Sequence, residues 1–279
     1  MMPFDFEGYF PYSILEAVQL FDRLYQEGKQ PLYYSGGTEI LTLGRLNLIF
    51  TKAVIDLKGI PECNTLTFQQ NSIVVGATLT LTQLAESKIF PFLGETAAKI
   101  ADRTSRNQIT LGGNLASDII FREAVLPLLL TDSILVIAGR DGIRHVPIHQ
   151  IFIEKLRLNP GQFLVQIITD DHYTKMPFYV VKKRKLEVVD YPLITLAALR
   201  TDTSIRVAIS GLCNFPFRSS SMEMELNNKS ATLEDRIERA VRYIPAPVLE
   251  DIRGSREYRV FVLQNTLYDA LTYLEGVSS

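Results

Sequence analysis

The spacing of apolar residues changes along the chain between the period of a helix and that of a strand. The first part of the chain begins with the helical period. Apolar residues recur at helical spacing over residues 13–25, and Ser13 followed three positions later by Glu16 is typical of a capped helix start. Short β-rich runs at 32–34 and 53–57 predict strands with a short helix between them. We therefore expect an opening helix followed by a small β-α-β unit.

The rest of the chain mixes strands and helices. Runs rich in β-branched and apolar residues predict strands at 65–68, 72–77, 134–138, 163–168, 178–181, 193–199 and 205–210. Helical spacing predicts helices at 81–87, 92–101, 233–243 and 257–274. A polar break at 170–173 suggests two domains of an α+β fold, 1–172 and 173–279. We expect the first to contain subdomains of about 1–57 and 58–172, and the second to be a sheet with helices on one side.

Composition narrows the classes of function. The 279 residues carry a net charge of −2, so we expect neither nucleic acid nor an anionic membrane surface as a partner. No apolar run is long enough to span a bilayer, and the acidic N-terminus is not typical of a secretory signal. Two distant cysteines and three scattered histidines predict no disulfide framework and no metal site. A reducing, cytoplasmic location fits this cysteine usage.

Two double glycines, each flanked by hydroxyl or amide side chains, are the candidates for a binding site. The first loop comprises Tyr33, Tyr34, Ser35, Gly36, Gly37, Thr38, Glu39 and Ile40, and the second comprises Thr110, Leu111, Gly112, Gly113 and Asn114. Glycine lets a ligand approach the backbone, and successive backbone N–H groups form an anion-binding concavity. Two such loops could supply bare N–H groups to one diphosphate. A plain tight turn is the alternative interpretation of Gly36-Gly37 when that pair is taken alone.

Taken with their surroundings, these motifs resemble the FAD-binding (medium) subunit of molybdenum hydroxylases, the family of xanthine, carbon monoxide and nicotinate dehydrogenases. The resemblance spans nearly the whole chain. It includes Arg106-Asn107 ahead of the second loop, the stretch Asp190-Tyr191-Pro192, and the late stretch from Arg253 to Arg259. It implies a two-part FAD-binding domain of the PCMH/vanillyl-alcohol-oxidase type, followed by a smaller α+β C-terminal flavoprotein domain.

The resemblance implies that both loops wrap the FAD pyrophosphate, with hydroxyls of Thr38 and Thr110 adding hydrogen bonds. It places Glu123, where the family usually has Asp, on an FAD hydroxyl. A solvated charge is the alternative for that residue. The usual small, proline-containing stretch after the second loop is replaced here by the bulky residues 117–122. These residues either reshape the surroundings of the flavin or alter a partner contact.

Three further positions match family residues at the flavin ring. Leu164 matches the family's apolar residue against the flavin, and Ile100 matches an apolar position near the ring, although core packing explains Ile100 equally well. Lys182 matches the family's flavin-ring lysine, and Lys185 is the fallback. A lysine there would stabilise negative charge on the reduced ring. The alternative is that Lys182 belongs to a basic, solvated edge.

The resemblance implies an oxidoreductase subunit that carries FAD and has no catalytic side chains of its own. Its partners would be a molybdopterin-binding large subunit and a 2Fe–2S small subunit, with NAD or another molecule as electron acceptor. Xanthine or a related purine is the expected substrate of the complex. Two alternatives stay open: a stand-alone FAD-dependent oxidoreductase of the same fold, and a non-catalytic scaffold subunit with a decayed flavin site.

Overall fold

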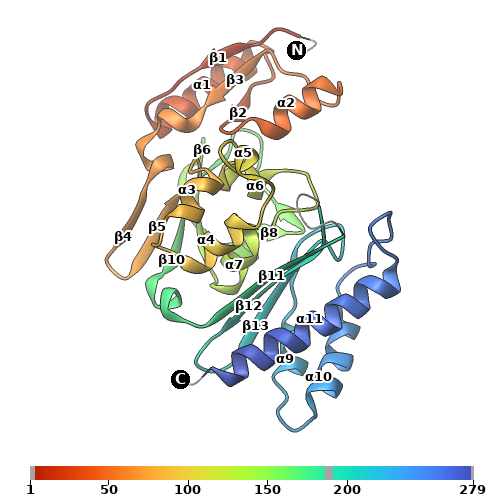
Figure 1. Ribbon diagram of the computed structural model, residues 1–279. Helices are drawn as coiled ribbons and strands as arrows, with labels where there is room; N and C mark the ends of the chain where they lie inside the picture. Colours follow the sequence, from red (N-terminus) through yellow and green to blue (C-terminus); the bar gives the residue numbers. More distant parts are fainter. Residues whose placement is uncertain (1–3, 186–190, 278–279) are drawn as a thin grey trace.

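The computed structural model describes residues 4–185 and 191–277, and the chain runs through successive layers from N-terminus to C-terminus (Figure 1). The first layer is a parallel sheet in the order β1-β3-β2, accompanied by helices α1 and α2. Its elements are β1 (Glu7–Tyr9), α1 (Ile14–Gln26), β2 (Leu32–Tyr34), α2 (Thr38–Arg45) and β3 (Ala53–Asp56). The first glycine pair therefore lies at the carboxyl end of β2, where ligands commonly bind in α/β sheets.

The middle layer is an antiparallel sheet in the order β4-β5-β10-β6-β7, with short helices on one face. Its strands are β4 (Leu66–Gln69), β5 (Ser72–Gly76), β6 (Ile134–Gly139), β7 (Gly142–Pro147) and β10 (Phe163–Asp170), beside a small hairpin of β8 (Phe152–Ile153) and β9 (Lys155–Leu156). Its helices are α3 (Leu81–Glu86), α4 (Pro91–Ala98), α5 (Arg103–Arg106), α6 (Leu111–Ala116), α7 (Val125–Leu130) and α8 (Ile148–Ile151). The chain uses 3₁₀ turns at Leu57–Gly59, Pro61–Asn64, Asp171–Lys175 and Val241–Tyr243.

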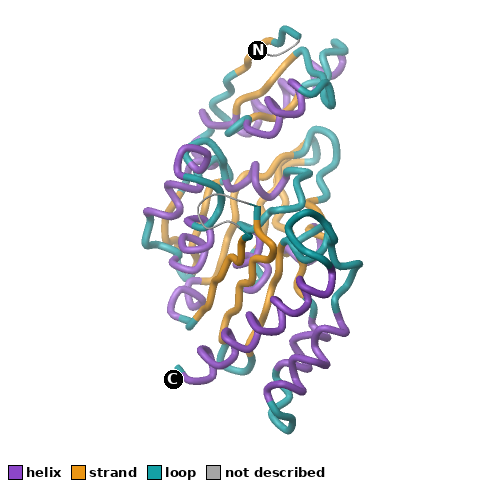
Figure 2. The backbone as a smooth tube through the Cα atoms, turned by 45° about the vertical axis from the view of Figure 1, so that its right-hand side comes forward, coloured by secondary structure: helices purple, strands orange, loops and turns teal. Residues whose placement is uncertain are grey.

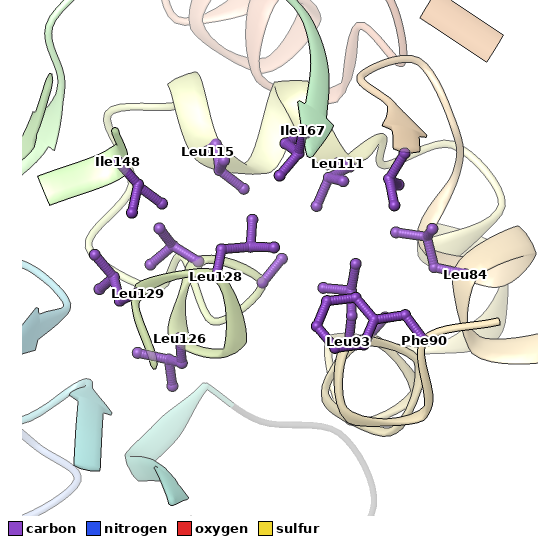
Figure 3. Packing of buried hydrophobic residues seen from close by; sticks show 14 of the residues in the cluster. Leu84, Phe90, Leu93, Leu111, Leu115, Leu126, Leu128, Leu129, Ile148 and Ile167 are labelled. Atoms are coloured by element: carbon purple, nitrogen blue, oxygen red, sulfur yellow. The ribbon is translucent and has the colours of Figure 1, made fainter. Parts of the chain in front are cut away.

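The middle sheet joins two cores because successive side chains of a strand point to opposite faces. Leu135 and Ile137 of β6 pack with the short helices, whereas Val136 and Ala138 pack with α1 and β3. Figure 3 shows the first of these cores, in which Leu111 and Leu115 of α6 face Leu128 of α7. Helix α6 begins at the second glycine pair, so this loop is anchored by its own apolar side chains.

The last layer is an antiparallel sheet in the order β11-β12-β13-β14, crossed by the long helix α11 (Figure 2). Its elements are β11 (Phe178–Arg184), β12 (Pro192–Arg200), β13 (Ile205–Ser210), β14 (Phe217–Arg218), α9 (Ser220–Leu226), α10 (Leu233–Ala240) and α11 (Arg256–Gly276). The layer's own helices cover one face, as expected. The other face packs on α4 and α7, so β12 is buried on both faces and its sequence is a continuous apolar run.

Arg259 of the late motif holds the end of this sheet to α11. Its side chain is fully buried, and its guanidinium donates to the carbonyl oxygens of Leu193 and Gly211. The same guanidinium lies 2.6 Å from a carboxylate oxygen of Asp251. A buried guanidinium is tolerated only when it is paired and hydrogen-bonded in this way.

Replacing this arginine tests how much the network contributes. We expect Arg259→Met to lower the free energy of unfolding by about 3 kcal/mol, because two buried carbonyls and the Asp251 carboxylate lose their donor. Urea unfolding followed by circular dichroism measures the change. Arg242→Met is the control, since Arg242 makes an exposed ion pair with Glu238 and should change stability by less than about 0.5 kcal/mol. Equal losses in the two variants would contradict this role for Arg259.

Candidate functional site

The structure brings the two glycine loops into direct backbone contact. A Cβ atom on Gly36 would lie 2.0 Å from the carbonyl oxygen of Gln108 and 3.3 Å from the backbone nitrogen of Thr110. Only glycine allows the two chain segments to approach this closely. Gly36 is therefore required by a contact between the loops, in addition to any approach of a ligand.

The first loop exposes backbone donors at the start of α2. Gly37 has the left-handed φ of +71° and precedes the helix, and no side chain caps it. Within the described part of the chain, the backbone N–H groups of residues 37–40 meet no hydrogen-bond acceptor. The Ser35 hydroxyl is also buried without a partner. Free N–H groups and the positive end of a helix dipole together favour an anion.

The second loop is built differently, and the expectation that it offers bare N–H groups is wrong. Leu111 donates to the carbonyl of Leu79, and Gly112 donates to the carbonyl of Ala77 at 2.7 Å. The N–H groups of Gly113 and Asn114 are taken by the side chain and carbonyl of Thr110, as in a capped helix start. Gly113 is exposed, and a Cβ on it would meet only the Thr110 hydroxyl. This loop offers an open backbone face at Gly113 and the proton of one hydroxyl.

The two tyrosines ahead of the first loop have different surroundings. The ring of Tyr33 packs between Phe21 and Phe163 in the core below the sheet, and burial raises the pKa of its phenol. Tyr34 lies at the loop instead, with the ammonium of Lys58 4.9 Å from the centre of its ring. Tyr34 is thus the one of the pair whose side chain borders the first loop.

Glu39 directs its carboxylate toward the divergent stretch after the second loop. One carboxylate oxygen accepts the backbone N–H groups of Asp118 at 2.9 Å and Ile119 at 3.2 Å. Burial raises the pKa of Glu39, and these two hydrogen bonds oppose the rise. The next residue, Ile40, and the exposed Thr38 complete the first turn of α2.

Glu123 and Lys182 form a buried ion pair. The Lys182 nitrogen lies 2.6 Å from a carboxylate oxygen of Glu123, and the two side chains are 6% and 2% exposed. The hydroxyl of Thr195 lies 3.5 Å from the same oxygen. Both alternatives that treated these residues as solvated charges are therefore wrong. Lys185 does not join the pair, because it donates to the carbonyl of Ile252.

Ile100 and Leu164 are both buried in the apolar core of the middle layer. The guanidinium of Arg106 donates to the carbonyls of Ile100 and Ala101, where the backbone turns through a positive φ of 46°. The Arg-Asn motif ahead of the second loop therefore fixes the backbone at Ile100. Nothing in the sequence pattern indicates this role.

Residues 117–122 are buried at Ser117, Phe121 and Arg122, whereas Asp118 is exposed. Phe121 stacks on Tyr191 with ring centres 4.7 Å apart, and the guanidinium of Arg253 lies over both rings. Arg122 is buried beside Phe152, and burial lowers its pKa. These contacts join the stretch to two family motifs of the C-terminal layer. Asp190 of the first motif lies outside the described residues.

Two surface hollows are lined by residues outside the glycine loops. One depression of about 720 Å³ borders Lys175 and Arg200, and another of about 240 Å³ borders Asp118 and Arg157. Among the described residues, no three His, Cys, Asp or Glu side chains are placed to hold a metal ion. The same part of the chain contains no helix that is long and apolar enough to cross a membrane.

Comparison with known proteins now assigns the chain to a class. Residues 4–169 match the family model described as the FAD binding domain in molybdopterin dehydrogenase. The chain is 26% identical over 272 residues to the carbon monoxide dehydrogenase medium chain of Hydrogenophaga pseudoflava, covering 93% of both proteins. It is 24% identical over 227 residues to the nicotinate dehydrogenase FAD-subunit of Eubacterium barkeri, covering 76% of this chain and 72% of that protein.

Solved structures agree on the fold. Carbon monoxide dehydrogenase from Hydrogenophaga pseudoflava matches with a TM-score of 0.86 and 24% identity over 98% of both chains. Quinoline 2-oxidoreductase from Pseudomonas putida 86 matches with a TM-score of 0.83 and 21% identity over 98% of this chain and 99% of that one. The α+β expectation is confirmed. The chain belongs to the FAD-binding medium subunits of molybdenum hydroxylases, and it is an oxidoreductase subunit.

The contact between the loops can be tested at Gly36. We expect Gly36→Ala to weaken FAD binding at least about tenfold, because the added methyl group forces the first loop away from Gln108. Fluorescence titration of the cofactor-free protein with FAD measures the affinity. Gly276→Ala is the control, since a Cβ there meets open space. Unchanged FAD affinity in Gly36→Ala would show that the close approach of the loops is not needed.

Proposed function

We propose that this chain carries FAD across its two glycine loops and passes electrons from the iron–sulfur centres of a partner subunit to NAD or another acceptor. The observation that carries the proposal is the uncapped start of α2, with its free N–H groups, set against the second glycine loop. A diphosphate is the part of FAD that this arrangement suits. The unpartnered hydroxyl of Ser35 in the same loop supports the fit.

Different residues of the two loops would make different contacts with the cofactor. The first turn of α2 would donate to phosphate oxygens, and the hydroxyls of Thr38 and Thr110 would add further hydrogen bonds. The open backbone at Gly113 would leave room beside the second loop. Tyr34 would border the first loop, whereas Tyr33 would contribute through its backbone and its packing in the core.

FAD supplies two-electron and one-electron transfer when it is bound. The chain would tune this chemistry through Lys182 and Glu123, whose charges form one buried pair. Because the Glu123 carboxylate offsets the charge of the Lys182 ammonium, the pair can donate a hydrogen bond while carrying less net positive charge than a lysine alone. Ile100 and Leu164 would keep the neighbourhood of the ring apolar and exclude water. No side chain of this chain is proposed as a catalytic acid, base or nucleophile.

Partners and substrate follow from the class of complex. We infer a molybdopterin-binding large subunit and a 2Fe–2S small subunit, because the relatives named above are subunits of enzymes with several chains. Substrate choice would belong to the large subunit. Those relatives carry the names of carbon monoxide and nicotinate dehydrogenases, so oxidation of xanthine or another purine stays a prediction from sequence. We also propose that the chain divides near residue 172 into an FAD-binding domain and a C-terminal domain.

The most direct prediction concerns the cofactor itself. The purified chain is expected to show flavin absorption and to release about one FAD per chain on acid denaturation, as a resident cofactor would. Absorption spectroscopy followed by chromatography of the released chromophore measures both. A colourless protein that also fails to take up added FAD would contradict the flavoprotein proposal and favour a scaffold subunit with a decayed site.

Replacing Ser35 is expected to raise the stability of the cofactor-free protein and to lower its affinity for FAD. We expect Ser35→Ala to stabilise the cofactor-free protein by about 1 kcal/mol, because a buried hydroxyl without a partner is removed. The same change should weaken FAD binding about tenfold, because a donor to phosphate is lost. Urea unfolding and FAD titration measure the two effects. Ser13→Ala, which removes the cap of α1, should lower stability and leave FAD affinity unchanged. If Ser35→Ala bound FAD normally, the hydroxyl would have no part in the site.

A further inference from the structure

Residues 117–122, which follow α6, form a short loop held at both ends. We call it the 117–122 segment. At its start, the backbone N–H groups of Asp118 and Ile119 both point at one carboxylate oxygen of Glu39. At its end, the guanidinium of Arg122 donates to the carbonyls of Ser117 and Glu154. The segment therefore has a fixed course between the first glycine loop and the β8–β9 hairpin.

The hydrogen bonds of Arg122 hold the other end of the segment to the middle layer. The bond to Ser117 closes the segment on itself at 3.0 Å, and the bond to Glu154 ties it to the hairpin at 2.7 Å. The guanidinium also lies 5.6 Å from the centre of the Phe152 ring. All these partners belong to the middle layer. Removing the Glu39 carboxylate would therefore free the segment's start while its end stays anchored.

Glu39 is poorly suited to touch a diphosphate. It is the second residue of α2, and the free N–H groups that favour an anion lie in the same helical turn. Two negative groups competing for those donors would repel each other. The carboxylate is instead drawn away by two charge-assisted hydrogen bonds from a segment 79 and 80 residues later in the chain. Its contacts connect the first loop to the segment that follows the second loop.

We propose that Glu39 is a positioning residue that does not contact FAD but clamps the 117–122 segment against the first glycine loop. The segment follows directly on α6, whose start is the second loop, so the clamp closes the two loops as one unit. The consequence for FAD rests on the proposed function. The clamp itself is a property of the cofactor-free chain.

Hydrogen exchange of the cofactor-free protein tests the clamp without FAD. In Glu39→Ala we expect the amides of Asp118 and Ile119 to exchange at least about tenfold faster, because each loses a charge-assisted hydrogen bond. FAD affinity is expected to fall about tenfold in the same variant, because the loops no longer close together. Glu39→Gln keeps an acceptor oxygen at the same place. It should retain both the slow exchange and the FAD affinity to within about threefold.

Glu16→Ala is the matched control, because Glu16 also lies in a first helical turn and its carboxylate accepts a backbone N–H, that of Tyr12, at 2.8 Å. That variant should leave both the exchange at 118–119 and FAD affinity unchanged. Unaltered exchange in Glu39→Ala would overturn the clamp. Weaker FAD binding with unaltered exchange would overturn it in favour of a direct contact, and faster exchange with unaltered affinity would overturn its role toward FAD. Failure of the parent protein to bind FAD would overturn the proposed function alone.

Discussion

The candidate site depends on one close approach between two stretches of backbone. Gly36 lies against the carbonyl of Gln108, where any other residue would place a carbon atom 2.0 Å from that oxygen. The second loop cannot move away, because its amides are bonded to Ala77 and Leu79 and its leucines are buried in the middle core. Gly36 is therefore the point at which the first layer contacts the second loop. As a result, the N-terminus of α2 faces that loop.

The two loops look alike in sequence but differ physically. In the first, glycine precedes a helix whose N-terminal N–H groups stay unbonded. In the second, Thr110 caps the helix and the neighbouring strand connection takes the remaining donors. In this site the first loop supplies the hydrogen-bond donors. The second loop supplies open space beside the exposed backbone of Gly113. This division explains why the cap at Thr110 and the missing cap at Gly37 coexist in one site.

Local chemistry made much of this architecture predictable from sequence. Ser13 caps the helix that it was expected to cap, and the β-rich runs form strands, because these features depend on neighbours a few residues away. The partners of Glu39 could not be predicted, since the N–H groups it binds lie 79 and 80 positions later and carry no side-chain signal. The same holds for Gln108, which contributes only a carbonyl to the contact with Gly36. Resemblance to a family predicted a set of site residues, but it did not indicate which of them contact one another.

The buried pairing of Glu123 with Lys182 depends on the length of the glutamate side chain. A carboxylate one methylene shorter would end about 1.5 Å farther back, and the 2.6 Å contact would be lost. Lys182 would then be a buried ammonium without a counter-charge, which costs several kcal/mol. Glu123 and Lys182 are therefore a single structural feature, because each fixes the placement of the other's charge.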